Sequence, residues 1–195
     1  TKHWIRLVKK GKIIAVSAPS GGGKTSVVKQ VLRDFPEIVF SVSVTTRPKR
    51  KNEVDGVDYF FVDDKEFERR IENNEFIEWE RFYDYYYGTL KSFVDDNISA
   101  GKSVLFEVDV KGALSLKKIY PDSHLIYIDP PSFEELVKRL KNRKTESEDD
   151  LQKRIDRAKM ELSYKPQFDY IFVNDELNKV YKNVKSLIKE ILSKE

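Results

Sequence analysis

The sequence lacks several features that would place the protein in particular classes. It contains no cysteine, which excludes disulfides, thiolate metal sites and a thiol nucleophile. No apolar run approaches the ~20 residues of a membrane-spanning helix, and residues 1–12 lack the apolar stretch of a signal peptide. Charge of one sign is also missing, since 36 Lys and Arg residues face 33 Asp and Glu residues. We therefore expect a cytoplasmic protein with neither nucleic acid nor membrane as partner.

Short apolar runs alternate with segments of helical periodicity along most of the chain. The predicted strands are Ile13–Ser17, Ser103–Val108, His124–Ile128 and Tyr170–Val173. The predicted helices are Lys24–Arg33, Ala113–Tyr120, Ser132–Lys141 and Leu177–Leu192. This alternation, with strands that are apolar throughout, predicts an α/β fold whose parallel central sheet is covered on both faces.

Two stretches interrupt this alternation. Residues 39–90 contain short, aromatic-rich segments typical of strands, such as Tyr59–Val62 and Phe76–Trp79. Residues 142–150 are highly charged and almost devoid of apolar side chains. We interpret residues 39–90 as an inserted α+β subdomain and residues 142–150 as a mobile loop, within a lid at about 142–154. Residues 1–38 and 91–195 then form the core.

A glycine-rich loop lies between the first predicted strand and helix. In Ser20–Thr25, three glycines let backbone N–H groups converge on phosphate oxygens, and the helix dipole favours the same anion. Lys24 would reach the β- and γ-phosphates of ATP, and the Thr25 hydroxyl would bind Mg²⁺. The pattern G-x-x-x-x-G-K-[ST] is complete except for Ala18 at its first glycine. A second G-K-S, Gly101–Ser103, precedes a strand and predicts only a turn.

Several sequence blocks together resemble the guanylate kinase family, in the order of that family from about residue 13 to the C-terminus. These blocks are Ala18–Lys24, Phe40–Arg50, Gly56–Tyr59, Asn74–Trp79, Tyr86–Thr89, Glu107–Asp109 and Asp129–Ser132. The resemblance implies a three-layer P-loop fold with an inserted GMP-binding subdomain and a small helical lid. It also implies Mg²⁺-dependent transfer of the γ-phosphate of ATP to GMP. The sequence does not indicate the oligomeric state.

The resemblance assigns the phosphate of GMP to Arg47 and Arg50, joined by the hydroxyls of Tyr59 and Tyr87. Two guanidiniums in a loop stiffened by Pro48 suit this role, because their planar arrays of donors match a phosphate monoester. Taken alone, the same basic stretch is equally compatible with a solvated surface loop.

Glu78 is the candidate that reads the base of GMP. Guanine presents N1–H and an amino group side by side, and a carboxylate accepts from both, whereas the N1 lone pair of adenine would be repelled. By similarity, the hydroxyls of Ser43 and Thr89 and the carboxylate of Glu107 join it. Without the resemblance, Glu78 is also compatible with a surface position on an alternating strand.

The donor side of the site follows from the loop and the resemblance. Asp109 follows Glu107 by two residues, so both side chains share one face at the end of a strand. We predict that Asp109 holds Mg²⁺ through water, with a cap of the next helix as an equal alternative. Where the family usually has glutamine, this chain has Lys111. The expected ATP-binding residues are Ala18, Pro19, Ser20, Gly21, Gly22, Gly23, Lys24, Thr25 and Asn174.

Phosphoryl transfer requires positioning and charge neutralisation more than covalent chemistry. The residues expected to neutralise charge are Lys24, Arg47 and, by similarity with the arginines of the family's lid, Arg139, Arg143 and Arg154. Arg157 has no counterpart in the family, and we expect it on the surface. Closure of the lid and the GMP-binding parts over the substrates is also expected.

Three rival functions are weaker. Asp109–Gly112 spells the D-x-x-G of GTPase switches, but Asn178–Tyr181 lacks the aspartate of their N-K-x-D guanine reader. Peptide-binding modules that resemble guanylate kinases typically lose phosphate-loop residues, whereas Gly23–Thr25 are intact here. Glu78 and the arginine loop argue against AMP, UMP or dTMP as the acceptor.

Overall fold

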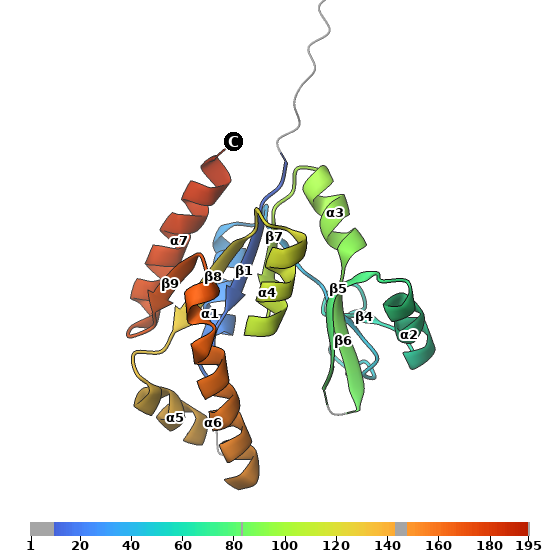
Figure 1. Cartoon of the computed structure of the whole chain (residues 1–195). Helices are drawn as coiled ribbons and strands as arrows, with labels where there is room; N and C mark the ends of the chain where they lie inside the picture. The colour runs from blue at the N-terminus through green and yellow to red at the C-terminus, as the bar shows by residue number, and fades with distance from the viewer. Residues whose placement is uncertain (1–9, 83, 143–147, 195) are drawn as a thin grey trace, which may run out of the picture.

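The computed structural model describes residues 10–82, 84–142 and 148–194 (Figure 1). Its larger sheet is wholly parallel, in the order β2-β7-β1-β8-β9. These strands are β1 (Ile13–Ser17), β2 (Val39–Phe40), β7 (Val104–Glu107), β8 (His124–Asp129) and β9 (Tyr170–Val173). The predicted parallel sheet is therefore confirmed, and all of the predicted strands are present.

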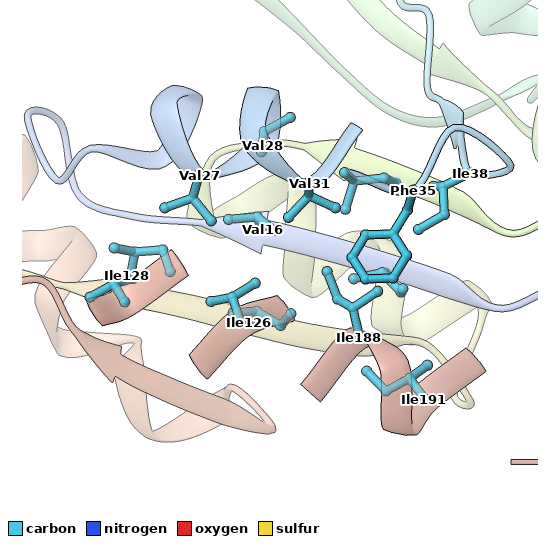
Figure 2. Close-up of a cluster of buried hydrophobic side chains, with 14 of the residues drawn as sticks. Val16, Val27, Val28, Val31, Phe35, Ile38, Ile126, Ile128, Ile188 and Ile191 are labelled. Atoms are coloured by element: carbon cyan, nitrogen blue, oxygen red, sulfur yellow. The ribbon is translucent and has the colours of Figure 1, made fainter. Parts of the chain in front are cut away.

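Helices cover both faces of this sheet. The helices α1 (Lys24–Asp34) and α7 (Leu177–Ser193) pack on one face, whereas α3 (Lys91–Ser99) and α4 (Val110–Ile119) pack on the other. In β1, Ile14 and Val16 join the first layer, and Ile13 and Ala15 join the second, because successive side chains of a strand point to opposite faces. Figure 2 shows the first layer, where valines of α1 and isoleucines of α7 enclose β1 and β8. Both faces of the central strands are thus covered, which accounts for their continuously apolar sequences.

The smaller sheet is mixed, in the order β4-β3-β6-β5. Its strands are β3 (Val44–Thr45), β4 (Phe60–Phe61), β5 (Phe76–Phe82) and β6 (Tyr85–Leu90), with α2 (Asp64–Glu72) against one face. Val44, Phe67 and Phe76 form the centre of its core. The insertion starts later than expected, because Val39–Phe40 pair with β7 in the larger sheet. Two partly buried apolar residues at a sheet edge gave no sign in the sequence of which sheet they join.

Two helices form the region expected to be a lid. The helix α5 (Phe133–Lys141) begins after Ser132, whose hydroxyl accepts from the Glu135 N–H. The helix α6 (Glu148–Ser163) packs on it through Leu136, Leu140 and Ala158, and a short 3₁₀ turn, η1 (Lys165–Gln167), follows. Residues 148–150 are therefore helical, and the predicted loop was wrong there. The apolar period begins only at Leu151, one turn after the start of the helix.

The two smaller parts extend from one end of the core. Figure 1 shows α5 and α6 on one side of that end and the smaller sheet with α2 on the other. This is the end where β1 and β7 finish, and carboxyl ends of parallel strands are where α/β folds bind ligands. Within the described residues, no helix is both long and apolar enough to cross a membrane.

Candidate active site

The glycine-rich loop between β1 and α1 is tightly packed. Gly23 has a φ of 90°, and a Cβ on it would lie 2.6 Å from Nδ2 of Asn174. A Cβ on Gly22 would lie 2.8 Å from the Cβ of Ala18, which occupies the place of the motif's first glycine. The Gly22 N–H donates to the Pro19 carbonyl at 2.8 Å, and Asn174 Nδ2 donates to the Gly22 carbonyl at 3.0 Å. A side chain at either position would approach its neighbours too closely, so both positions favour glycine.

The second G-K-S behaves as predicted. Gly101 follows the end of α3 with a φ of 78°, and β7 begins at Val104. No helix begins after Gly101–Ser103, so no helix dipole supports a phosphate there.

The side chains that follow the loop meet the end of β7. Lys24 Nζ donates to the Val108 carbonyl at 3.3 Å, and the Thr25 hydroxyl donates to Oε1 of Glu107. This meeting follows from the parallel pairing of β1 with β7, in which Val16 lies opposite Glu107. The expected Lys24, Thr25 and Glu107 therefore share one location.

Asp109 caps α4, as the alternative interpretation foresaw. Its Oδ1 accepts from the Gly112 N–H at 2.7 Å, and its Oδ2 accepts from Arg157 at 2.9 Å. Across the described residues, no cluster of three or more His, Cys, Asp or Glu side chains could hold a metal ion by itself. Mg²⁺ in a nucleotide site needs only one or two protein oxygens, because phosphates and water complete its shell. The oxygens of Thr25, at the start of α1, and of Asp109, just after β7, fit that requirement.

On the smaller sheet, Arg47 is the centre of a polar cluster. Its guanidinium donates to Glu53 at 2.6 Å and to the Pro48 carbonyl at 2.8 Å. It also lies 5.4 Å from the ring centre of Tyr59, whose ring is 6.1 Å from that of Tyr87. The structure thus gathers Arg47, Tyr59 and Tyr87, as the resemblance implied.

Glu53 is a residue of this cluster that the sequence analysis missed. One carboxylate oxygen holds Arg47, and the other accepts from the Arg50 N–H at 2.8 Å, while the side chain of Arg50 is exposed. Hydrogen bonds from Arg47 and from this backbone N–H lower the pKa of Glu53 below its usual range. The only signal was an acidic residue six positions after Arg47, which is too common to single out.

Glu78 lies on β5 opposite Thr89 of β6. The buried Thr89 hydroxyl donates to Oε1 of Glu78 at 2.8 Å. Burial raises the pKa of Glu78 to about 7, against the lowering effect of the Thr89 hydrogen bond and with smaller contributions from Asp109 and Glu80. Ser43 directly precedes β3, and extending the register of β3 with β6 by one residue puts it opposite Thr89. Glu78 and Thr89 are therefore brought together, whereas the carboxylate of Glu107 accepts from Thr25 beside the phosphate loop.

The lid arginines occupy different positions. Arg139 on α5 donates to Glu135 at 3.2 Å and to the Asn174 carbonyl at 3.3 Å, so it reaches the residue that supports the phosphate loop. Arg154 lies on α6 and is partly buried. Arg143 falls outside the described residues. Asn174 itself contacts the loop backbone, and its predicted approach to adenine stays a prediction.

Arg157 was expected on the surface, and its side chain is indeed 39% exposed, but it also makes two ion pairs that the sequence did not indicate. It lies at the end of β7, where it pairs with Asp109 at 2.9 Å and with Glu161 at 2.9 Å. Glu161 is buried, and its other oxygen accepts from the Ser20 N–H of the phosphate loop at 3.0 Å. Arg157 and Glu161 are four residues apart on a helix, a spacing that suggested at most a surface pair.

One large cavity of the described residues lies away from this site. A cavity of about 960 Å³ lies at the opposite edge of the large sheet, between residues such as Lys12, Tyr120 and His124. A cavity of about 310 Å³ adjoins Glu78 and Trp79. The convergence of the glycine-rich loop with the end of β7 defines the candidate active site.

Comparisons with known proteins agree with this geometry. Residues 10–191 match the family model described as guanylate kinase. A guanylate kinase of Thermotoga maritima is 47% identical over 180 residues, which cover 92% of this chain and 87% of that protein. A guanylate kinase of Chlorobaculum tepidum is 46% identical over 188 residues, 96% of each chain.

A solved structure has the same fold along nearly the whole chain. The crystal structure of guanylate kinase from Anaplasma phagocytophilum superposes with a TM-score of 0.72 at 32% identity, covering 95% of this chain and 88% of that one. The resemblance found in the sequence blocks is thus confirmed. This chain belongs to the guanylate kinase family.

Proposed function

We propose that this protein transfers the γ-phosphate of ATP to GMP, producing ADP and GDP in purine nucleotide metabolism. The hydrogen-bonded pair of Glu78 and Thr89 carries the proposal, since it presents a carboxylate suited to guanine. The relatives named guanylate kinase support the same acceptor. The phosphate loop supplies the site for the donor.

The phosphate of GMP would bind to Arg47 and Arg50 with the hydroxyls of Tyr59 and Tyr87. To do so, it takes the place that Glu53 holds beside Arg47. A phosphate that carries nearly two negative charges competes well against a single carboxylate for a guanidinium. Glu53 thus keeps the arginine ordered until the acceptor arrives.

The guanine base would be held by Glu78, Ser43 and Thr89. Thr89 donates to one oxygen of Glu78 and thereby fixes the plane of the carboxylate. In that orientation the ionised group accepts from guanine N1–H and from the amino group. Adenine would leave a buried carboxylate facing a lone pair, and unpaired polar groups in such a site are rejected by roughly 10⁴-fold or more.

On the donor side, backbone N–H groups of the loop and Lys24 would bind the phosphates of ATP. The Thr25 hydroxyl donates a hydrogen bond to Glu107, which leaves the lone pairs of its oxygen available to Mg²⁺. Asp109 would hold the ion through water. When bound there, Mg²⁺ would offset the negative charge of the phosphates.

The transfer itself needs little proton chemistry. A phosphate oxygen of GMP is already ionised at neutral pH and attacks the γ-phosphorus, while charge spreads over the transferring group. Lys24 and the arginines at 47, 139, 143 and 154 would neutralise that charge. Closure of α5, α6 and the smaller sheet would exclude water and prevent hydrolysis of ATP.

An acceptor panel tests the proposal. ADP production is measured with ATP and Mg²⁺ while GMP, AMP, UMP, CMP or dTMP is offered separately. We expect turnover with GMP alone, and Glu78→Gln is expected to reduce it and to weaken the discrimination against AMP. Glu80→Gln is the matched control, because it removes a carboxylate from the same face of β5 and should keep the preference for GMP. A folded wild-type protein that turns over no acceptor would contradict the proposal and favour a peptide-binding module.

Other expectations stay predictions. These are the cytoplasmic location, the lack of nucleic-acid and membrane partners, and the residue roles assigned above. The boundaries of the GMP-binding subdomain also stay a prediction, with its start moved beyond β2.

A further inference from the structure

We propose that Arg157 is a positioning residue for nucleotide binding: it holds Asp109 and Glu161 at once and thereby couples the end of β7 to the start of the phosphate loop. The inference deepens the proposed function, on which it rests for the role of the site. It concerns a residue for which the family resemblance offered no role.

The coupling is a continuous series of hydrogen bonds. The Ser20 N–H donates to Oε2 of Glu161 at 3.0 Å, and Arg157 Nε donates to Oε1 at 2.9 Å. A terminal nitrogen of the same guanidinium donates to Oδ2 of Asp109 at 2.9 Å. Oδ1 of Asp109 accepts from the Gly112 N–H at 2.7 Å. The series therefore joins the phosphate loop, α6 and the first turn of α4.

The burial of Glu161 gives this series its strength. Its side chain is only 5% exposed, and a buried carboxylate is costly unless both oxygens have partners. Here one partner is a backbone N–H and the other is Arg157. Removal of Arg157 would leave a buried charge with one neutral donor, so Glu161 would no longer hold Ser20 in the same way.

Arginine suits this position better than lysine. Its guanidinium presents several donors in one rigid plane, so Nε and a terminal nitrogen serve two carboxylates at the same time. Arg157→Lys would keep the positive charge, but one ammonium nitrogen would replace the two guanidinium nitrogens that donate to Asp109 and Glu161. The effect of Arg157 should therefore depend on its shape as well as on its charge.

The two ends of the series belong to two parts of the expected donor site. Ser20 belongs to the loop that would surround the phosphates, and Asp109 follows the strand whose Glu107 accepts from Thr25. The cap bond to Gly112 fixes one oxygen of Asp109, and Arg157 fixes the other. Loss of Arg157 frees both ends together, which predicts weaker binding of nucleotide with Mg²⁺.

Calorimetric binding of Mg·ADP tests this coupling without any acceptor. We expect the Kd to rise about tenfold for Arg157→Ala, in line with the loss of hydrogen bonds between charged groups. Arg157→Lys should recover part of the affinity. Lys159→Ala, which removes an exposed cation of the same helix, should bind like the wild type.

A double-mutant cycle separates coupling from a general loss of structure. Because the series passes through both residues, the double variant Arg157→Ala with Glu161→Gln should have a Kd for Mg·ADP no higher than that of the weaker-binding single variant. In turnover assays, kcat/KM for ATP should fall while KM for GMP stays within about twofold. Thermal unfolding of each variant establishes that it is folded, and Arg157→Lys and Glu161→Gln keep the test available if Arg157→Ala does not fold.

Two outcomes would overturn the inference. One is an unchanged Kd for Mg·ADP in folded Arg157→Ala, and the other is strictly additive effects in the double variant. Neither outcome concerns the acceptor. A wild-type protein that binds Mg·ADP but phosphorylates no GMP would instead contradict the proposed function and leave the coupling to be read from the Kd values.

Discussion

The two sheets of this protein differ in how completely their side chains are buried. All residues of β1 in the larger sheet are buried, and helices cover both sides. In the smaller sheet, the buried cluster within the described chain consists of Val44, Phe67 and Phe76, and other apolar residues around it are only partly buried. One face of that sheet packs on α2, while the other carries Glu78 and Thr89. A sheet that must present polar side chains to a ligand has one face fewer with which to stabilise itself.

The two regions would also recognise their phosphates differently. The loop after β1 would use backbone N–H groups, in a conformation that packed glycines and Asn174 help to fix. The smaller sheet uses side chains that already have partners, such as Arg47 with Glu53. Binding of the acceptor therefore requires Arg47 to exchange a carboxylate for a phosphate. The donor site would add backbone N–H groups to side chains that also have partners, Lys24 with the Val108 carbonyl and Thr25 with Glu107. The predictions below test this contrast.

The largest effect is expected from the donor site. Lys24→Ala should lower kcat by about 10³-fold or more, since it removes a fixed positive charge that would stabilise the transferring phosphoryl group. The Kd for GMP should stay within about twofold, because the acceptor is held by the other sheet. Turnover assays and calorimetry measure the two quantities, with the exposed Lys29→Ala on α1 as control. A large loss of GMP affinity in Lys24→Ala would contradict the prediction that the two regions bind donor and acceptor independently.

Truncation of one buried phenylalanine in each region compares their stabilities. Phe106 in the larger sheet and Phe67 in α2 are 2% and 0% exposed, and each change to alanine should cost about 3–5 kcal/mol. Phe106→Ala should lower the global stability. Phe67→Ala should accelerate amide exchange in β3–β6 and leave β1 and β8 protected. Equal acceleration in both sheets would show that they unfold as one unit.

Arg47→Lys tests the exchange of partners. The variant keeps the charge but loses the planar donors, so KM for GMP should rise about 30- to 100-fold, as expected for lost charge-assisted hydrogen bonds. KM for ATP should change little. Lys49→Ala, at an exposed position in the same loop, serves as control in the same steady-state assay. A matching rise in both KM values would mean that Arg47 does not belong to the acceptor site alone.

The smallest effect is a pH dependence of acceptor binding. Because burial raises the pKa of Glu78 to about 7, the carboxyl becomes protonated as the pH falls below neutrality. Guanine requires the ionised form, so KM for GMP should be about tenfold higher at pH 6 than at pH 8. Titration of the GMP phosphate, with a pKa of about 6, contributes equally to a Glu78→Gln reference. A wild-type profile that matches Glu78→Gln would contradict the role of Glu78.

The sequence predicted the larger sheet well and the smaller one poorly. The bounds of β1 and β9 were predicted without error, because both read as continuous apolar runs; β1 is buried along its whole length, whereas Ile171 and Val173 of β9 are exposed. The strands β3 and β4 have two residues each, too few for any period, and their parallel pairing depends on contacts distant in sequence. The assignment of Val39–Phe40 failed for the same reason.

The sequence likewise predicted some residues of the candidate site and missed others. The phosphate loop could be predicted because its glycines and Lys24 are contiguous and their chemistry is local. Glu53, and the pairing of Arg157 with Asp109, could not be predicted, since a charged residue in a sequence does not specify its partner. Two roles were predicted for Asp109, a cap of the next helix and a water-mediated contact with Mg²⁺. The structure shows the cap of α4, and the contact with Mg²⁺ remains a prediction.

By itself, the sequence determined the parallel α/β core, the phosphate loop and the family, because local periodicity and contiguous motifs encode all three. The tertiary structure decided which carboxylate holds each arginine and how deeply Glu78 is buried. It also joined Ser20 to Glu161, 141 positions along the chain. Partner choice and pKa depend on distances and on exclusion of water, and these arise only when the elements pack together.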